Sequence, residues 1–448
     1  MNKKKWTLLV CCLLLASGYY KLFYKTFSEK VVAKSADCII ALDVKRIINT
    51  MIWNVITTPG QWKKGSIFPS GKDGIDWYDM VKVPDYVFVF HSAGQPANAW
   101  YTVLEINNRN DFSKGLQQYG FEKKEDLLFS KQLGILLLQK GDTLLISNLA
   151  PEDHQYLRQT ADDLFIKMQY SARATVKTNV DASSHLSIQF SKNTFMKDAA
   201  VIKANFDKNS IRAEASLIPA EGLDFNESSF SYPVNSLCAL GFTQPSQAVY
   251  NLISDSTRAT ISKALNFDID SLLLPVNHNY TMDITAIQSR TDSAISYVYD
   301  ENFIPVQKVV VNQVMEPSFN FTITGQGIPQ VYNYWQNNGK LESTVEGDLF
   351  IPMPFVKSYC SQKNSQELTI TSRNYTALAA DKKVHCVFFF NILLSKIPIP
   401  VIKFLPDGIM KLITNIESLN VTAQKNKERI EVHAILNKKE NDLPIIEW

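Results

Sequence analysis

Apolar and polar residues alternate along two similar stretches of the chain, residues 202–219 and the closing run 421–438. Each stretch has two alternating runs around a short polar turn, "FDKNS" in the first and "KNKER" in the second. Alternation with a period of two is typical of strands with one buried face, and Asp, Asn and Lys favour a solvated turn. Each stretch is therefore predicted to be a β-hairpin.

The two stretches align without a gap, and the aligned residues are identical at positions 204, 208, 211, 215 and 217 of the first stretch. A second similarity lies where each half begins. There, "ADCIIALDVKRIINTMIWNVI" and "NSLCALGFTQPSQAVYNLI" both show a short apolar strand and then a helical pattern, which Val249, Leu252 and Ile253 supply in the second. These similarities occur in the same order and predict a duplicated domain. The alternative is that two unrelated hairpins look alike.

The segments between these ends differ in composition. The first half combines strand patterns with helices predicted over 110–119 and 151–168. The second half is richer in strands and shows four strand patterns before a short helix at 329–336, namely 279–287, 293–300, 306–314 and 318–325. The predicted fold class is α+β: an N-terminal membrane anchor followed by two related, strand-rich modules with largely antiparallel sheets.

The first 25 residues predict the compartment. Lysines 3–5 precede an uncharged run from Trp6 to Tyr20, so the lysines are expected to stay cytoplasmic and the rest to be exported. Residues 22–24 extend the apolar run toward the roughly 20 residues that a bilayer requires. We expect an uncleaved signal anchor, with the ectodomain periplasmic or on the cell surface. The small residues 16–18 leave a cleaved signal peptide as the alternative.

Composition shifts divide the remainder of the chain. Residues 26–35 form a polar stalk, and residues 220–235 are rich in Pro, Gly, Ser and Asn and are predicted to be a linker. The first α+β module is expected at 36–219 and the second at 236–448.

The second module carries an apolar insertion at 391–413, which appears when His185 is aligned with His385. Its three prolines exclude one continuous helix, and its three lysines suit an anionic membrane surface. We expect it to dock on the bilayer, a bound lipid or a partner protein; the alternative is that it caps the sheet core. The candidate docking residues are Ile397, Ile399, Val401, Ile402, Phe404, Leu405 and Ile409.

Charge and chemistry restrict the function. The 46 basic residues nearly balance the 44 acidic residues, which argues against a nucleic-acid partner. The six histidines are scattered singly, and no nucleophile elbow, metal clamp or dinucleotide fingerprint occurs, so we expect no enzymatic activity, cofactor or metal. The cysteines beyond the anchor could form two disulfides in three connectivities or stay as buried thiols. They are Cys38, Cys238, Cys360 and Cys386.

The stretch "ADCIIALDVKRI" opens the ectodomain directly after the stalk. This arrangement resembles uncharacterised bacterial envelope proteins in which a signal anchor precedes a duplicated α+β region and a short strand leads into a D-[VL]-K motif. The second half departs from that motif, because Gly241 and Phe242 replace its Asp-Val pair. The resemblance implies an envelope location and brings no catalytic residues.

The sequence therefore predicts a non-enzymatic, membrane-anchored envelope protein whose duplicated ectodomain binds a protein, a lipid or a surface polymer. An envelope hydrolase is the first alternative, because catalytic carboxylates need only be close in space and not in sequence. A purely structural envelope spacer is the second.

Overall fold

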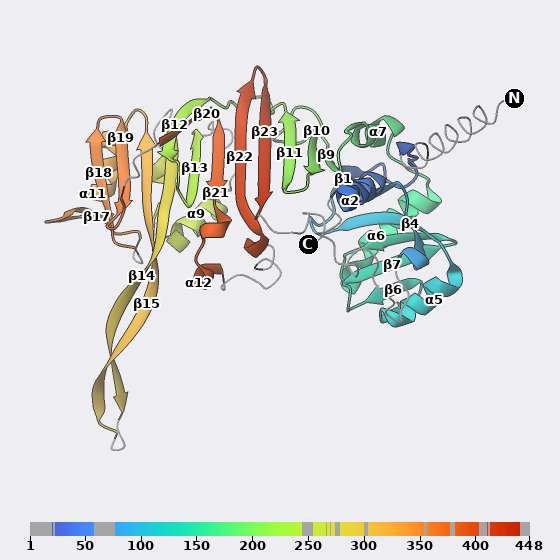
Figure 1. Ribbon diagram of the computed structural model, residues 1–448, viewed down its shortest axis with the longest axis horizontal. Helices are drawn as coiled ribbons and strands as arrows, with labels where there is room; N and C mark the ends of the chain where they lie inside the picture. Colours follow the sequence, from blue (N-terminus) through green and yellow to red (C-terminus); the bar gives the residue numbers. More distant parts are fainter. Residues whose placement is uncertain are drawn as a thin grey trace. The chain divides into compact units, whose positions relative to one another are not determined.

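The computed structural model describes residues 20, 23–57, 77–243, 254–265, 267–268, 270–273, 278–299, 303–353, 356–376, 381–402, 410 and 413–439. These residues fall into two compact units, one ending at Leu217 and the other beginning at Ile218. Both are strand-rich with antiparallel sheets and a minority of helices, which confirms the α+β class (Figure 1). The predicted helical face of Val249, Leu252 and Ile253 lies outside the described residues.

Most strands of the first unit's sheet lie beside a strand that is next to them in the sequence, but β8 lies beside β4, and β1 lies between β3 and β9. The strand order is β5-β6-β7-β8-β4-β3-β1-β9-β10-β11. The short strand β2 (Val81–Lys82) pairs with the end of β4. The strands are β1 (Ala36–Asp43), β3 (Tyr86–Ser92), β4 (Trp100–Ile106), β5 (Phe121–Lys124), β6 (Leu127–Ser130), β7 (Ile135–Lys140), β8 (Thr143–Ser147), β9 (Leu186–Phe190), β10 (Ala200–Phe206) and β11 (Ser210–Leu217).

Helices pack on both faces of this sheet. On one face, α6 (His154–Ala161), the following turn Asp162–Ile166 and α7 (Arg173–Asp181) contribute Leu157, Leu164 and Val176 to the main core. On the other face, α4 (Trp77–Met80) and α5 (Arg109–Gln118) build a smaller core around Met80 and Phe112. The helix α2 (Val44–Thr57) follows β1 directly, as the sequence predicts.

The second unit has the strand order β16-β17-β18-β19-β15-β14-β13-β21-β22-β23. Its main core lies on one face only, where α11 (Ile328–Asn337) buries Ile328, Val331 and Trp335. Its strands are β13 (Cys238–Thr243), β14 (Asn279–Tyr299), β15 (Pro305–Thr324), β16 (Leu341–Thr344), β17 (Gly347–Phe350), β18 (Ser358–Asn364), β19 (Glu367–Ser372), β21 (Phe388–Ile392), β22 (Ile416–Asn426) and β23 (Arg429–Lys438).

Two predicted hairpins are present as expected. β10 and β11 pair around the first polar turn, and β22 and β23 pair around the second. The register is the same in both, since Ala204 pairs with Ala213 and the aligned Ala423 pairs with Val432. The residues between the paired strands, 207–209 in the first hairpin and 427–428 in the second, are all charged or polar, whereas the strands carry the alternating apolar residues.

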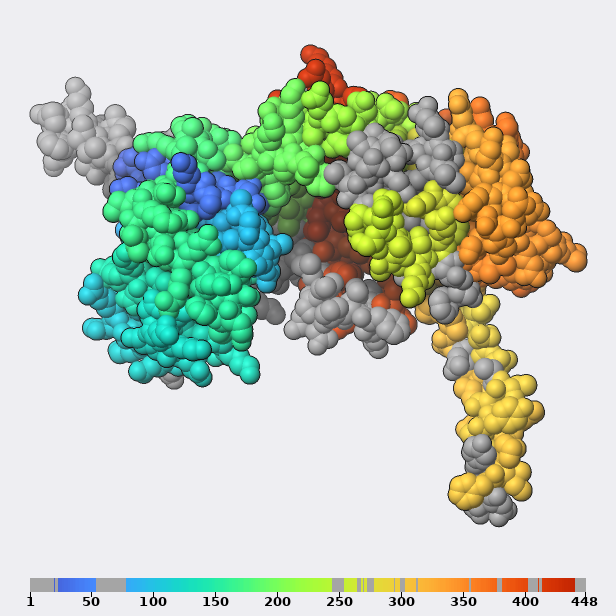
Figure 2. All heavy atoms as spheres, turned by 180° about the vertical axis from the view of Figure 1, so that it is seen from behind, coloured from blue at the N-terminus to red at the C-terminus, as the bar shows by residue number. Residues whose placement is uncertain are grey.

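The four strand patterns predicted between residues 279 and 325 form only two strands. β14 and β15 pair along their whole length and project as a narrow arm from the second unit (Figures 1 and 2). The polar breaks in the pattern do not end the strands, because neither strand has another partner in the arm and both of its faces are exposed there.

Three further predictions need correction. The predicted stalk, residues 26–35, is part of the first unit, because Val32 and Ala33 are fully buried in its main core. The predicted linker contains the strand β12 (Ser228–Pro233), which pairs with β20 (Asp381–Cys386) in a separate two-stranded sheet. His385 therefore lies in β20, whereas His185 lies just before β9, and the two do not correspond. The residue at the position equivalent to His185 is Val387. The amide of Asp43 donates to the carbonyl of His185, and the amide of Thr243 donates in the same way to the carbonyl of Val387. Correcting the alignment shortens the apparent insertion by two residues.

The extra length of the second half still falls where the sequence places it. Eighteen positions lead from Leu186 to its partner Ala204, whereas 35 lead from Phe388 to its partner Ala423, a difference of 17. Between β21 and β22 the structure describes a 3-10 turn, Leu394–Lys396, and the four-residue helix α12 (Ile399–Ile402).

Candidate binding cleft

Polar side chains cover one face of the sheet in the second unit. Directly opposite residues of an antiparallel pair share a face, and every second residue of a strand returns to it. The pairing register therefore places ten polar residues in three rungs across four strands, and we call them the polar ladder. The rungs are Asn279–Thr324–Glu367, Thr281–Thr322–Thr369–Ser361 and Asp283–Asn320–Thr371.

The polar ladder lines a cleft of about 590 Å³. The rest of the lining comes mainly from β12 and from Lys363, Tyr375 and Asp381. Phe230 and Tyr232 of β12 are buried against Phe389, so the two-stranded β12–β20 sheet is packed onto the main sheet and forms one wall. A wall fixed by aromatic packing gives the cleft a defined shape.

Hydrogen bonds link neighbouring members of the polar ladder. The Nδ2 of Asn320 lies 3.2 Å from Oδ1 of Asp283 and 3.2 Å from Oγ1 of Thr322. The hydroxyls of Ser361 and Thr369 are 2.7 Å apart. These contacts hold the side chains in place, while most of the ladder stays half-buried or exposed and can still contact a ligand.

The same face of the first unit is apolar. There, Phe90 pairs with Tyr101, and Val103 pairs with Leu145, which pairs with Leu138. All five are buried and belong to the main core beneath α6 and α7. In the strand order and register, Val103 and Leu145 occupy the places of Thr322 and Thr369.

The covering elements differ in the same way. Between β8 and β9 the first unit inserts α6 and α7, which close its sheet face. Between β19 and β21 the described part of the second unit contains only β20, which pairs with β12 instead. Within the described residues, the polar ladder is therefore bordered by the β12–β20 sheet and is not covered by helices.

Asp283 lies at the floor of the cleft and is only 2% exposed. Burial is the main cause that raises the pKa of its carboxyl, and Asp381 adds to the shift, while hydrogen bonding by Asn320 and Tyr375 opposes it. Although Tyr375 is close enough to affect this pKa, Oδ2 of Asp283 makes no hydrogen bond of normal geometry within the described residues. A buried carboxylate oxygen without a donor is costly, so this atom marks an unsatisfied position in the cleft.

One serine and one histidine meet at the rim. The Oγ of Ser229 lies 3.2 Å from Nδ1 of His385, and Nε2 of His385 lies 3.6 Å from Glu227. Ser229 and His385 are directly opposite residues of β12 and β20, and the histidine side chain is 63% exposed. Cross-strand pairing at the surface is sufficient to explain this contact.

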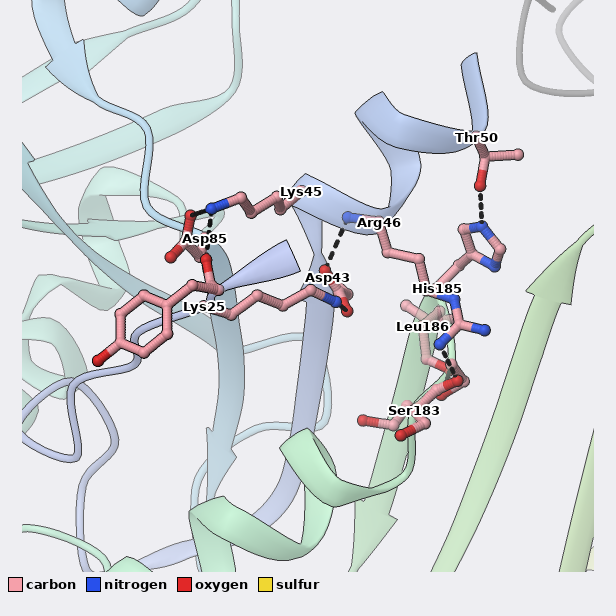
Figure 3. Close-up of polar contacts among 12 residues, drawn as sticks. Lys25, Asp43, Lys45, Arg46, Thr50, Asp85, Ser183, His185 and Leu186 are labelled. Atoms are coloured by element: carbon pink, nitrogen blue, oxygen red, sulfur yellow. Dashed lines mark hydrogen bonds and ion pairs between the residues drawn. The ribbon is translucent and has the colours of Figure 1, made fainter. Parts of the chain in front are cut away.

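A second polar cluster lies in the first unit, around the start of α2 (Figure 3). Asp43 is buried, accepts a hydrogen bond from the Arg46 amide at 2.8 Å and forms an ion pair with Lys25, so it caps the helix. Nε2 of His185 lies 2.7 Å from the Thr50 hydroxyl. Burial, followed by the charge of Arg46, lowers the pKa of His185. These contacts satisfy the buried groups and make a helix-capping network.

The four cysteines within the described residues are free thiols. Cys38, Cys360 and Cys386 are buried and Cys238 is half-buried, and none of the four is in a disulfide. Burial raises the pKa of Cys38 to about 11, that of Cys386 to about 11 and that of Cys360 to about 12. Since the thiolate is the reactive form, these side chains are suited to packing and not to redox chemistry.

The predicted docking residues lie apart from the polar ladder in the sequence and only partly within the described structure. Ile399 is 68% exposed, whereas Ile397 and Val401 are half-buried. The backbone of Ile402 ends α12, and Phe404, Leu405 and Ile409 lie outside the described residues. Their role as a docking surface stays a prediction.

The predicted anchor, residues 1–25, also lies largely outside the described residues. Within the part of the chain that the structure describes, no helix is both long enough and apolar enough to cross a membrane. The described residues also contain no group of three or more His, Cys, Asp or Glu side chains placed to hold a metal ion.

Comparisons with known proteins add no identification. No family model, no curated protein and no solved structure matches this chain.

The sequence contains a signal for the polar ladder that a search for catalytic motifs does not use. In "NYTMD", "NFTIT" and "ELTIT", every second residue is Asn, Thr, Asp or Glu, and the residues between them are apolar or aromatic. Because threonine is common in strands, this pattern predicts the strands and a shared polar face but does not by itself predict a binding site.

Proposed function

We propose that the chain is a non-enzymatic, membrane-anchored envelope protein with a duplicated ectodomain, and that its second unit binds a surface polymer on the polar ladder. The observation that carries the proposal is the cleft itself. A sheet face that forms the core of the first unit is open and polar in the second. The anchor over residues 1–25 rests on the charge and apolar pattern of the sequence.

The duplication is supported by strand order and register. Ten strands of the first unit and ten of the second follow the same spatial order, beginning with the hairpin that follows α5 or α11 and ending with the closing hairpin. Leu42 pairs with Leu186 as Phe242 pairs with Phe388, and the gap-free alignment of the two closing hairpins preserves their register. Unrelated sheets have no reason to share both properties.

The lining of the cleft favours a polymer over a lipid or a protein. An acyl chain requires an apolar pocket, and protein interfaces are rich in exposed aromatic anchors. Phe230 and Tyr232 line the cleft but are almost fully buried, so their rings pack the β12–β20 sheet onto the main sheet and are not exposed as anchors for a partner. Hydroxyl and amide groups dominate the remaining surface.

Co-sedimentation tests the proposal. The full chain, kept in a zwitterionic detergent, is mixed with insoluble, lipid-free wall material from the cells that produce it. The wild type should pellet with the wall, and Thr281→Val with Thr322→Val should lower the pelleted fraction several-fold. Thr102→Val is the matched control, because Thr102 is a half-buried strand threonine of the first unit whose hydroxyl has no partner in the described structure. Equal pelleting of all three proteins would contradict the assignment to this cleft.

An envelope hydrolase is the second candidate, and two observations favour it. Asp283 and Asp381 line one cleft and differ in burial, and Ser229 contacts His385 at its rim. Acid–base hydrolysis of a glycosidic bond needs two carboxylates on opposite sides of that bond. The assay is release of soluble fragments from the same wall material. Release by the wild type that Ser229→Ala or Asp381→Asn abolishes would establish the hydrolase, and its absence supports binding without cleavage.

A further inference from the structure

The polar ladder consists mostly of groups that both donate and accept hydrogen bonds. Threonine and serine hydroxyls do so with one oxygen, and asparagine does so with its amide. The ladder has five threonines, two asparagines and one serine, besides Asp283 and Glu367. Ligand groups that also donate and accept, above all hydroxyls, can pair with such a surface in many orientations.

The charges around the cleft disfavour anions. Among the described residues that line it, Asp283, Glu367 and Asp381 stand against Lys363, which forms an ion pair with Glu367. Phosphate and carboxylate ligands are usually held by arginine, lysine or helix N-termini, and these acidic groups would repel them. A neutral ligand avoids this repulsion.

The dimensions of the polar ladder exceed those of a single sugar ring. Neighbouring strands lie about 4.8 Å apart, so the four-strand rung spans roughly 14 Å. Successive rungs are two residues apart, so three rungs extend roughly 13 Å along the strands. A ligand that contacts all three rungs is therefore an oligomer.

The Oδ2 of Asp283, which accepts no hydrogen bond of normal geometry from the described residues, is an independent indication of a ligand. It is buried at the floor of the cleft, while Oδ1 of the same carboxylate accepts from Asn320. A hydroxyl donor, supplied by the ligand or by a water that the ligand holds, would satisfy it. Through Asn320, Asp283 also positions Thr322 at the centre of the polar ladder.

We infer that the polar ladder binds a neutral saccharide chain of several sugar residues, with the threonine and asparagine side chains hydrogen-bonded to its hydroxyls and Asp283 as a positioning residue. This inference rests on the proposed function and names its polymer by chemical class. It predicts binding that depends little on salt, because hydrogen bonds between neutral groups are not screened as ion pairs are.

Calorimetric titration of the full chain tests the inference. The detergent must be zwitterionic, since the headgroup of a glucoside or maltoside would compete for the cleft. The probes are neutral β-1,4-linked glucose and N-acetylglucosamine hexamers, neutral α-1,4-linked glucose hexamers, a polygalacturonate hexamer and a hexalysine peptide. We expect a neutral hexamer to bind with an affinity that 0.5 M NaCl leaves within about two-fold.

Variants locate the binding. Thr322→Val and Thr281→Val each remove one hydroxyl with little change of shape, and each should weaken binding roughly three- to ten-fold. Asp283→Asn should weaken binding by a similar factor, because the amide introduced at position 283 can rotate and change the hydrogen bond that holds Asn320. Thr102→Val should bind like the wild type.

The outcomes separate the two proposals. If no neutral hexamer binds but Thr281→Val with Thr322→Val still lowers wall pelleting, the saccharide class is wrong and the proposed function survives. If wall pelleting is also unaffected, both are wrong. Salt-sensitive binding of hexalysine, lost in Asp283→Asn, would replace the saccharide with a cationic ligand. Neutral hexamer binding that the threonine variants leave unchanged would place the site outside the polar ladder and overturn the inference.

Discussion

The two sheet faces that carry Leu145 and Thr369 occupy the same place in the strand order and register of their units, yet one is a core and the other a cleft. In the first unit, α6 and α7 cover the face and bury it. In the second, no helix within the described residues covers the face, and its residues are polar. The contrast shows that one arrangement of strands supports either role, and that the connection between two strands decides which.

The largest expected effect comes from exchanging side chains between the two faces. Leu145→Thr removes methyl groups and buries a hydroxyl in a site that is fully buried, and should lower the free energy of unfolding by about 3 kcal/mol. Thr322→Leu, at a half-buried position of the polar ladder, places its extra methyl groups in the cleft and should change that free energy by less than about 1 kcal/mol. Denaturant unfolding of both variants measures the difference. Equal losses would show that the two faces are packed alike.

A glycine gives the next largest effect. A Cβ at Gly241 would lie 2.2 Å from the ring of Phe389, which packs the β12–β20 sheet onto the main sheet. Gly241→Ala should therefore destabilise the second unit by about 1–3 kcal/mol. The register corrects the alignment of Gly241 with Asp43 that the sequence suggests: it makes Ala41 the equivalent residue of the first unit, and Ala41 lies opposite Ser187 and not opposite a phenylalanine. A thermal melt of Gly241→Ala that matches the wild type would show that the wall is not tightly packed.

The buried carboxyl of the cleft predicts a pH dependence. The folded-state pKa of Asp283 is raised, so the folded state holds its proton where the unfolded state has lost it. Its ionisation therefore lowers stability as the pH rises above about 3.9, the usual aspartate pKa. Asp283→Asn should be more stable than the wild type at pH 7, with a smaller advantage below about pH 4. A constant difference across this range in urea unfolding would contradict the pKa assignment.

The smallest effect is expected at the predicted docking surface. Ile399 is 68% exposed, so Ile399→Ser should leave the free energy of unfolding within about 0.5 kcal/mol of the wild type. If the segment docks on a bilayer, the same variant should weaken binding to anionic phospholipid vesicles, measured by flotation of chain that lacks residues 1–25. Unchanged flotation together with lower stability would assign Ile399 to the core.

The fold class and the two hairpins could be predicted because period-two alternation reports one buried face directly. "TLLIS" in β8 lacks that alternation, since α6 and α7 cover one face of its sheet there and α4 and α5 cover the other. The polar ladder was not predicted, because its rungs join residues from four strands across nearly one hundred positions. The single arm formed by β14 and β15 was missed because pairing between two strands tolerates polar breaks that propensity would count as turns.

Thiol labelling tests the central contrast most directly. Val103 and Thr322 occupy equivalent positions of the core face and the cleft face. Val103→Cys and Thr322→Cys are each labelled with a neutral maleimide in the native full chain, and site-resolved mass spectrometry separates the new cysteine from the native ones. Thr322→Cys should react roughly a hundred-fold faster, since a buried site must open at a cost of about 3 kcal/mol. Equal rates at the two positions would contradict the account of one face as core and the other as cleft.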